Sequence, residues 1–241
     1  MREPAVIRLP PLAGGQGQSW RALIEIAPQL GHHWLLIGGQ MVFLHEVERD
    51  STDDVRPTND IDLVVDLRIE PTVLGHTHRV LAAAGFEQDL PSPEGVAHRY
   101  RRGGATIDVL APDHLGTRAK LSLGSGRTIE APGTSQAFGR VSLVRVELDD
   151  DTGGIVRRPT LVGALLGKAA AVTEIVSMSS AERAKHVRDV DALARLLGPA
   201  DRASASLTAK ERSILAQVAE HPDMSRLAAR SIQLTTAPTH G

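Results

Sequence analysis

The stretch DIDLVVDL, from Asp60 to Leu67, places two carboxylates at the start of an apolar run. Its Ile, Leu and Val residues are typical of a buried strand, where an unpaired carboxylate is costly. Side chains alternate between the two faces of a strand, so Asp60 and Asp62 share one face, about 6.5 Å apart along the chain. Ile61 and Leu63 share the opposite face. We therefore expect one face of this strand in the core and the other in a functional site.

A β-hairpin is predicted around the two-glycine turn at Gly103 and Gly104. A two-residue turn sets the cross-strand pairs, and partners in such pairs share a face. The predicted pairs are Arg102 with Ala105, Arg101 with Thr106, Tyr100 with Ile107, and Arg99 with Asp108. If this hairpin lies next to the DIDLVVDL strand, Asp108 becomes a third carboxylate beside the first two.

Three carboxylates on adjacent strands repel one another unless cations lie between them. Two Mg²⁺ ions about 3.5 to 4 Å apart, or Mn²⁺ in their place, are the usual solution in phosphoryl and nucleotidyl transfer. The alternative is that Asp60 ends a strand while Asp62 and Asp108 only face solvent. Arg99 and Arg101 share the face of Asp108, so they either hold a triphosphate bidentately or only neutralise Asp108.

Periodicity divides the chain of 241 residues into three parts. Residues 1–18 are rich in Pro, Gly and Gln and predict a flexible N-terminal arm. Residues 19–158 mix strands and helices, whereas residues 159–241 are helical in pattern, and residues 111–140 resist assignment. The expected fold class is α+β, a mixed sheet with flanking helices followed by a helical C-terminal half. The predicted elements are helices near 20–30, 40–48, 71–84, 161–177, 181–197 and 207–220, and strands near 33–39, 60–67, 96–102, 105–111 and 141–148.

Composition limits the function classes. The formal net charge of −2 excludes a generally basic nucleic-acid coat, and the absence of Cys excludes disulfides and Cys-based zinc sites. No signal-peptide pattern and no run near the roughly 20 apolar residues of a membrane span occur, so we expect a cytoplasmic protein without a membrane partner. Aromatic residues make up 2% of the chain, so recognition of RNA would depend on phosphates and Arg. The histidines at 32, 33, 76 and 78 lack carboxylates at metal-binding spacing and favour solvent-facing or capping roles.

Three motifs occur in order: a Gly pair at Gly38 and Gly39 before a helix, T-x-D-I-D at residues 58–62, and I-D-V at residues 107–109. Together they resemble the DNA polymerase β-type nucleotidyltransferase superfamily. The resemblance implies that the Gly pair closes the first strand and lets the backbone approach nucleotide phosphates. It also makes Thr58 a candidate nucleotide-binding residue.

The segments PTLVGALLGKAAAV and KHVRDVDALARLL are similar to the AbiEii toxin-type nucleotidyltransferases, which include MenT-like toxins. The resemblance covers about residues 33–197. The chain departs from the family pattern at two places. The loop before Asp60 is longer than expected and carries an acidic insert at residues 50–54, and the second acidic motif reads D-V-D at residues 189–191, so either aspartate could match the family's functional one. The core stripe of that helix puts Asp189 and Asp191 on opposite flanks. Only one can face the site, and Asp189, on the flank of His186, is favoured.

Lys168 interrupts a helix that is otherwise apolar from Leu161 to Val172. A lysine in such a helix needs an anionic partner. The functional interpretation is that Lys168 binds a nucleotide phosphate, and the alternative is that it snorkels out of a seam between helices.

These observations predict a Mg²⁺-dependent nucleotidyltransferase that moves a nucleoside monophosphate from an NTP to an acceptor hydroxyl. The AbiEii resemblance implies a toxin of a toxin–antitoxin system, with the 3′ end of tRNA as acceptor and an antitoxin protein as partner. Asp60 and Asp62 would hold both ions, and Asp108 would hold the catalytic ion and help deprotonate the acceptor. Arg157 and Arg158 are candidates for a positive rim that binds RNA. The alternatives are a small-molecule nucleotidyltransferase of the aminoglycoside type, favoured by the acidic insert, and a non-catalytic regulatory protein that keeps the fold.

Overall fold

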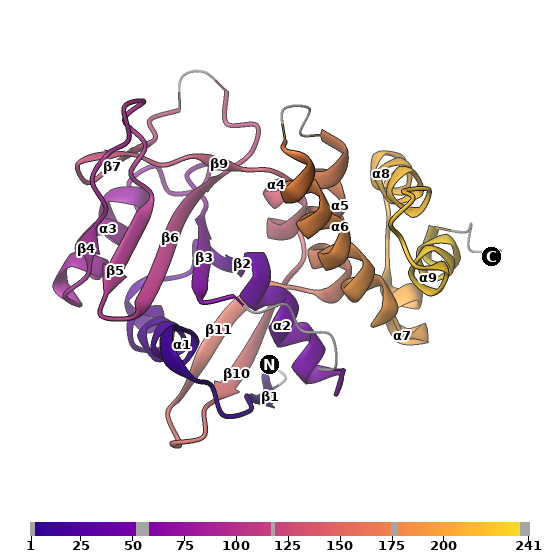
Figure 1. Cartoon of the computed structure of the whole chain (residues 1–241), viewed down its shortest axis with the longest axis horizontal. Coiled ribbons are helices and arrows are strands. Elements are labelled where there is room, and N and C mark those ends of the chain that lie inside the picture. Colours follow the sequence, from indigo (N-terminus) through magenta and orange to yellow (C-terminus); the bar gives the residue numbers. More distant parts are fainter. Residues whose placement is uncertain (1–2, 52–57, 117–118, 175–177, 237–241) are drawn as a thin grey trace.

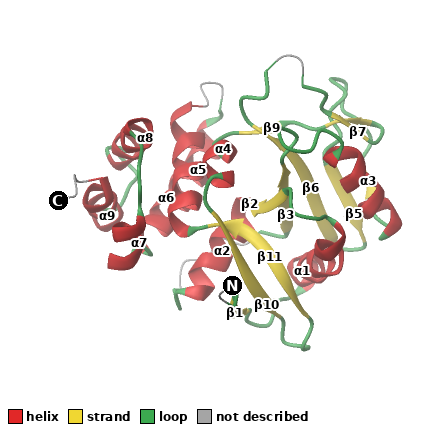
Figure 2. Cartoon of the chain, turned by 180° about the vertical axis from the view of Figure 1, so that it is seen from behind, coloured by secondary structure: helices red, strands yellow, loops and turns green. Residues whose placement is uncertain are grey.

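The structure, a computed structural model, describes residues 3–51, 58–116, 119–174 and 178–236. The expected α+β class is confirmed: mixed sheets occupy the N-terminal part, and the C-terminal region is helical (Figure 1). Figure 2 shows the same division from behind, with the strands and their covering helices on one side and the C-terminal helices on the other.

The larger sheet carries the two carboxylate strands next to each other. Its order is β2 (Trp34–Ile37), β3 (Asp60–Val65), β6 (Ala105–Pro112), β5 (Arg99–Arg102) and β4 (Glu87–Gln88), with β9 (Glu130–Ala131) paired to β6. The strands β3 and β6 run parallel with Asp62 opposite Asp108. The hairpin of β5 and β6 has the predicted register, with Arg99 opposite Asp108. The sheet therefore brings the three carboxylates to one region, as the hairpin argument requires.

Three helices of the N-terminal part support this sheet. Helix α1 (Gly14–Ile26) packs against β3 and β6, and the short 3₁₀ helix η1 (Ala27–Gln29) continues it. Helix α2 (Gly38–Glu48) leaves β2 directly, and its Gln40 side chain accepts a 2.8 Å hydrogen bond from the buried indole of Trp20. Helix α3 (Val73–Ala83) ends before Gly85, whose φ of +79° is the left-handed conformation expected at that position.

A second sheet corrects the prediction of a flexible arm at residues 1–18. Strand β1 (Ala5–Arg8) pairs in parallel with β10 (Val141–Glu147), and β10 pairs with β11 (Gly153–Pro159). Ile7 is buried in the core, and α1 already begins within the supposed arm. The sequence also left β11 unassigned, because its first residues, Gly153 and Gly154, read as a turn. The unpaired backbone of β10 provided partners for both strands, which no local pattern shows.

The C-terminal region packs onto the rest of the molecule. It contains α5 (Leu161–Glu174), α6 (Ser180–Arg195), α7 (Pro199–Ser204), α8 (Ala209–Ala219) and α9 (Arg226–Thr236). Capping boxes begin α6 at Ser179 and α8 at Thr208. One hydrophobic cluster runs from Ile7 to Ile232, so the change of pattern near residue 159 does not interrupt the core.

The segment at residues 111–140, which the sequence left unassigned, forms short elements beside the sheet. These are β7 (Ser122–Leu123), β8 (Gly126–Arg127), β9 and α4 (Thr134–Phe138). Helix α4 packs against α5, so this segment links the sheet to the helical region. Among the described helices, none combines the length and the apolar character that a membrane crossing requires.

Candidate active site

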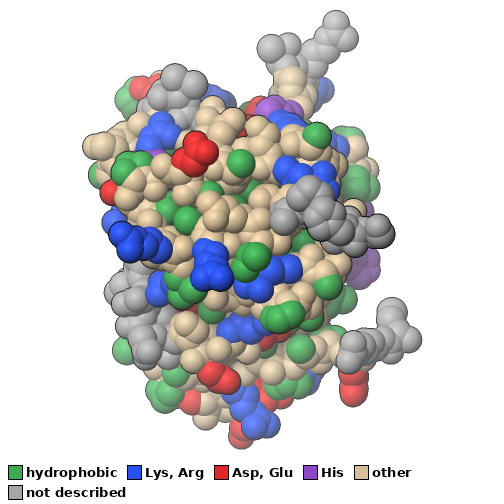
Figure 3. Space-filling model, turned by 90° about the vertical axis from the view of Figure 1, so that its right-hand side faces the viewer, with side chains coloured by type: hydrophobic (Ala, Val, Ile, Leu, Met, Phe, Trp, Pro, Cys, Tyr) green, Lys and Arg blue, Asp and Glu red, His purple; other side chains and the backbone are tan. Residues whose placement is uncertain are grey.

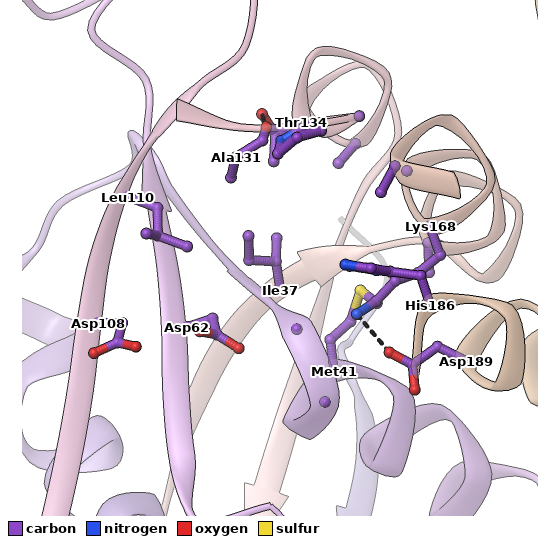
Figure 4. A pocket seen from close by; sticks show the side chains of 18 of the residues that line it. Ile37, Met41, Asp62, Asp108, Leu110, Ala131, Thr134, Lys168, His186 and Asp189 are labelled. Atoms are coloured by element: carbon purple, nitrogen blue, oxygen red, sulfur yellow. Dashed lines mark hydrogen bonds and ion pairs between the residues drawn. The ribbon is translucent and has the colours of Figure 1, made fainter. Parts of the chain in front are cut away.

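A pocket of about 480 Å³ lies between the strands β3 and β6 and the helices α5 and α6. The pocket lining contains every site residue predicted from the sequence except Arg101. Figure 4 shows Asp62 and Asp108 on one wall and Lys168, His186 and Asp189 on the opposite wall, with Ile37 and Met41 between them. The predicted residues in the lining are Gly38, Gly39, Thr58, Asp60, Asp62, Arg99, Asp108, Lys168 and Asp189.

Arg99 binds two of the three carboxylates. Its Nε donates to Asp108 Oδ1 at 2.8 Å, and one terminal nitrogen donates to Asp108 Oδ2 at 2.7 Å and to Asp60 Oδ2 at 3.0 Å. The hydrogen bonds to Asp108 are the main reason that the pKa of Arg99 is raised. In this geometry Arg99 acts as the neutralising partner of Asp108, which is one of the two alternatives that the sequence left open.

Asp62 has no such compensation. Within the described part of the chain its carboxylate makes no hydrogen bond or ion pair, and desolvation raises its pKa to about 7. Repulsion from Asp108 and Asp60 adds to this effect, and the charges of Lys168 and Arg99 oppose it. The site thus contains one carboxylate for which a cation would be a favourable partner.

Gly38 lets the chain pass close to this carboxylate. Its φ is +70°, and a Cβ at this position would lie 2.6 Å from Asp62 Cγ. Gly38 and Gly39 form the first turn of α2, where backbone N–H groups lack helical acceptors. The glycine pair therefore brings a helix N-terminus next to the acidic wall of the pocket.

The residues present fit a divalent cation such as Mg²⁺ or Mn²⁺. Asp60, Asp62 and Asp108 supply carboxylate oxygens, which these ions prefer, and the unpaired Asp62 shows a deficit of positive charge. Arg99 already contacts Asp60 and Asp108, so ions shared by all three carboxylates would require Arg99 to move away.

Lys168 meets an anionic partner inside the protein. Its Nζ lies 2.7 Å from Asp189 Oδ2, and the two residues are only 8% and 4% exposed. Lys168 therefore does not snorkel to solvent, and the favoured choice of Asp189 over Asp191 agrees with the pocket lining. Asp191 instead pairs with Arg195 at 3.1 Å and accepts a hydrogen bond from the backbone N–H of Ser225 at 2.7 Å.

Three arginines that the sequence analysis proposed for anion binding have other partners. Arg101 donates to Asp89 at 2.9 Å and does not line the pocket. Arg158 is only 2% exposed and forms an ion pair with Glu48, so its place in an RNA-binding rim is wrong. Arg157 donates to the backbone oxygen of Trp34 at 3.3 Å, and desolvation lowers its pKa. Strand β11, which the sequence did not predict, explains the wrong placement of Arg158, because a strand in a sheet turns alternate side chains inward.

The pocket also contains residues that the sequence analysis did not assign to the site. Lys185 and His186 of α6 line it together with Glu182, and residues 129–134 form a further part of the wall. Helical spacing already put His186 on the flank of Asp189, and the same spacing could have placed Lys185, four positions before Asp189, on that face. Residues 129–134 offered no such signal, since their segment has no clear periodicity.

Two further predictions concerned the histidine pairs and the acidic insert before Asp60. His76 and His78, predicted to face solvent or to cap, make hydrogen bonds to the backbone oxygen of Gln29 at 2.7 Å and to the hydroxyl of Tyr100 at 2.9 Å. Most of the acidic insert, from residue 52 onward, lies outside the described residues.

Comparison with known proteins adds no identification. No protein-family model matches the chain, and no curated protein matches its sequence.

Proposed function

We propose that the protein is a Mg²⁺-dependent nucleotidyltransferase that moves a nucleoside monophosphate from an NTP to an acceptor hydroxyl. One observation carries the proposal: Asp60, Asp62 and Asp108 lie on adjacent strands in one pocket, and Asp62 makes no ion pair with any described residue. Its motifs resemble those of the AbiEii toxin-type enzymes, which supports the same reaction.

Two Mg²⁺ ions, when bound, would neutralise the carboxylates and the triphosphate and make the acceptor hydroxyl more acidic. Asp60 and Asp62 are the residues to hold both ions. Asp108 would hold one of them and accept the proton of the acceptor hydroxyl. The acceptor oxygen then forms a bond to the α-phosphorus, and the bond from the α-phosphorus to the bridging oxygen breaks. Pyrophosphate leaves with that oxygen.

The opposite wall would bind the phosphates. The first N–H groups of α2, at Gly38 and Gly39, are suited to an anion. Lys185 and His186 line the same cavity, and Lys168 would have to share its charge between Asp189 and a phosphate. Arg99 would exchange Asp108 for the triphosphate, which presents the same paired oxygen geometry to its guanidinium. This exchange frees Asp108 for the cation and the proton.

For the acceptor we propose the 3′ end of tRNA, and for the biological role a cytoplasmic toxin held in check by an antitoxin protein. Figure 3 shows Lys and Arg side chains in a band across the face that carries the C-terminal helices. Such a band suits phosphate contacts, although the chain as a whole is slightly acidic. The exposed basic residues of α8 and α9 are Lys210, Arg212, Arg226 and Arg230.

A second function has one observation in its favour. Arg99 satisfies Asp108 with two hydrogen bonds and reaches Asp60 with a third, so the acidic wall is partly neutralised without any metal. A non-catalytic regulatory protein that keeps the fold would have this internal ion pairing. The unpaired Asp62 argues against it, because a protein without a cation to bind gains nothing from that carboxylate.

The decisive experiment is incubation with each α-labelled NTP, Mg²⁺ and total RNA, with an aminoglycoside in a parallel reaction. We expect label on tRNA, and we expect Asp62→Asn to abolish it. Asp89→Asn is the matched control, because Asp89 lies outside the pocket and pairs only with Arg101 among the described residues. Label on the aminoglycoside alone would replace tRNA with a small-molecule acceptor. No label on any acceptor would favour the regulatory protein.

A further inference from the structure

A second group of metal-ligating side chains lies outside the pocket. Asp113 and His114 follow the end of β6, and Glu174 is the last residue of α5. One potential ligand atom of each, a ring nitrogen or a carboxylate oxygen, lies within 4.8 Å of the other two. None of the three lines the candidate active site.

The separations between these atoms suit ligands of one ion better than hydrogen bonds. His114 Nε2 lies 3.7 Å from Asp113 Oδ2 and 3.8 Å from Glu174 Oε2. A hydrogen bond from a ring nitrogen to a carboxylate would be about 2.7 to 3.2 Å long. Two ligands at about 2.0 to 2.1 Å from a tetrahedral Zn²⁺ lie about 3.3 Å apart. A shortening of about 0.4 to 0.5 Å would bring each carboxylate oxygen to this separation from His114 Nε2, and the two oxygens lie within 4.8 Å of each other.

Both carboxylates are held in place by contacts with other residues, and Asp113 Oδ2, the oxygen next to His114, is itself a hydrogen-bond acceptor. Asp113 Oδ1 accepts a 2.9 Å hydrogen bond from the N–H of Ser135, and Oδ2 accepts one of 2.7 Å from the N–H of Gly133. Glu174 Oε1 pairs with Lys210 Nζ at 3.0 Å, whereas Oε2 is the atom near His114. Outer contacts of this kind fix the direction of metal ligands.

The hydrogen bonds and ion pairs that orient the two carboxylates do not account for the conformation and position of His114. Its φ is +59°, unusual for a residue other than glycine, and its side chain is 62% exposed. It makes no hydrogen bond with the described residues, yet its ring lies between two carboxylates from distant parts of the chain. An exposed imidazole in this position is accessible to an ion from solvent.

We propose that Asp113, His114 and Glu174 form a Zn²⁺ site separate from the carboxylate pocket. One imidazole and two carboxylates are nitrogen and oxygen ligands that Zn²⁺ accepts, and three protein ligands leave the fourth position to water. Two carboxylates and Lys210 sum to a charge of −1 with His114 neutral, so the group attracts a cation.

The ion would connect two walls of the candidate active site. Asp113 holds Gly133 and Ser135 at the start of α4, and Gly133 and Thr134 line the pocket. Glu174 ends the helix that carries Lys168. A Zn²⁺ ion at this position therefore ties the segment after β6 to α5 and stabilises the packing of the sheet against the helical region.

The test is calorimetric titration of the metal-free full chain with Zn²⁺, in excess Mg²⁺ to occupy the pocket carboxylates. We expect one Zn²⁺ per chain and a higher melting temperature. His114→Asn and Glu174→Gln should each weaken Zn²⁺ binding at least tenfold. Asn tolerates a positive φ, so His114→Asn removes the imidazole without new backbone strain. The control His32→Asn replaces another exposed histidine and should leave the affinity unchanged.

Co²⁺ gives a second readout, because nitrogen and oxygen ligands in a tetrahedral site produce a visible absorption band. This band should appear in the wild-type protein and in Asp62→Asn, and it should be lost in His114→Asn. A melting curve without metal verifies that each variant is folded. Zn²⁺ affinity that is equal in His114→Asn and His32→Asn, or no Zn²⁺ binding at tenfold molar excess over protein, would overturn the proposal.

Discussion

Replacement of Asp62 by Asn isolates the electrostatic cost of the acidic wall. The Asp62 carboxylate has no hydrogen bond or ion pair in the described structure, and its pKa of about 7 lies well above the ordinary value of 3.8. Asn has nearly the same shape but no charge. We therefore expect the metal-free variant to be more stable than the wild-type protein at neutral pH and above.

The size of the effect follows from the pKa. A rise of about three units corresponds to at most about 4 kcal/mol of unfolding free energy. Asp62 is half-buried, so solvent screens part of this penalty, and the new amide also lacks a hydrogen-bond partner. A gain of about 1 to 2 kcal/mol is therefore expected, at about 2 to 4 °C of melting temperature per kcal/mol.

The pH dependence has a definite sign. Below about pH 4 Asp62 is protonated in both states, so charge contributes no difference between variant and wild type. Between about pH 4 and 7 the carboxylate ionises only in the unfolded state, and the wild-type protein loses stability relative to the variant as pH rises through this range. Above about pH 7 the difference should be constant.

Urea denaturation at several pH values, with EDTA or with Mg²⁺, measures these differences. Mg²⁺ should stabilise the wild-type protein and have little effect on Asp62→Asn, because the variant lacks a central ligand. The control Asp89→Asn changes an exposed, paired carboxylate and should show neither effect. If Asp62→Asn were less stable than wild type at pH 8 without metal, the assignment of an uncompensated carboxylate would be refuted.

Three further predictions concern the surroundings of this carboxylate. Gly38→Ala should lower the unfolding free energy by about 1 to 3 kcal/mol in urea denaturation, because its φ of +70° and the nearby Asp62 exclude a Cβ; wild-type stability would contradict this. Lys168→Met should destabilise the fold by about 3 to 5 kcal/mol in thermal melts because it breaks the buried ion pair with Asp189, and Lys168→Met with Asp189→Leu should recover most of it. Arg158→Met should also lower the melting temperature, yet the salt dependence of tRNA binding, measured by fluorescence anisotropy, should not change because Arg158 is buried.

Local patterns were sufficient where the chain obeys a simple period. The alternation of side chains in a strand put Asp60 and Asp62 on one face, and the two-glycine turn set Arg99 opposite Asp108. Helical spacing favoured Asp189 over Asp191. These predictions depend only on backbone geometry over a few residues, so they did not need the rest of the fold.

Prediction failed where a segment takes its structure from a distant partner. Strand β1 exists because β10 has a free edge, far away in the sequence, and β11 begins with two glycines that locally read as a turn. The burial of Arg158 follows from that unexpected strand. Segments at residues 111–140 form elements too short to show any period.

The sequence by itself determined which carboxylates share a face, because this follows from the period of a strand. It put Asp189 and Asp191 on opposite flanks of α6 and favoured Asp189, but it did not decide which flank meets the pocket. Only the tertiary structure decided which charges neutralise each other: Arg99 with Asp108, Lys168 with Asp189, and no described residue with Asp62. The reason is physical. A charge pair depends on distances of about 3 Å between side chains and on their burial, and in the pair of Lys168 and Asp189 the packing of two separate helices sets both.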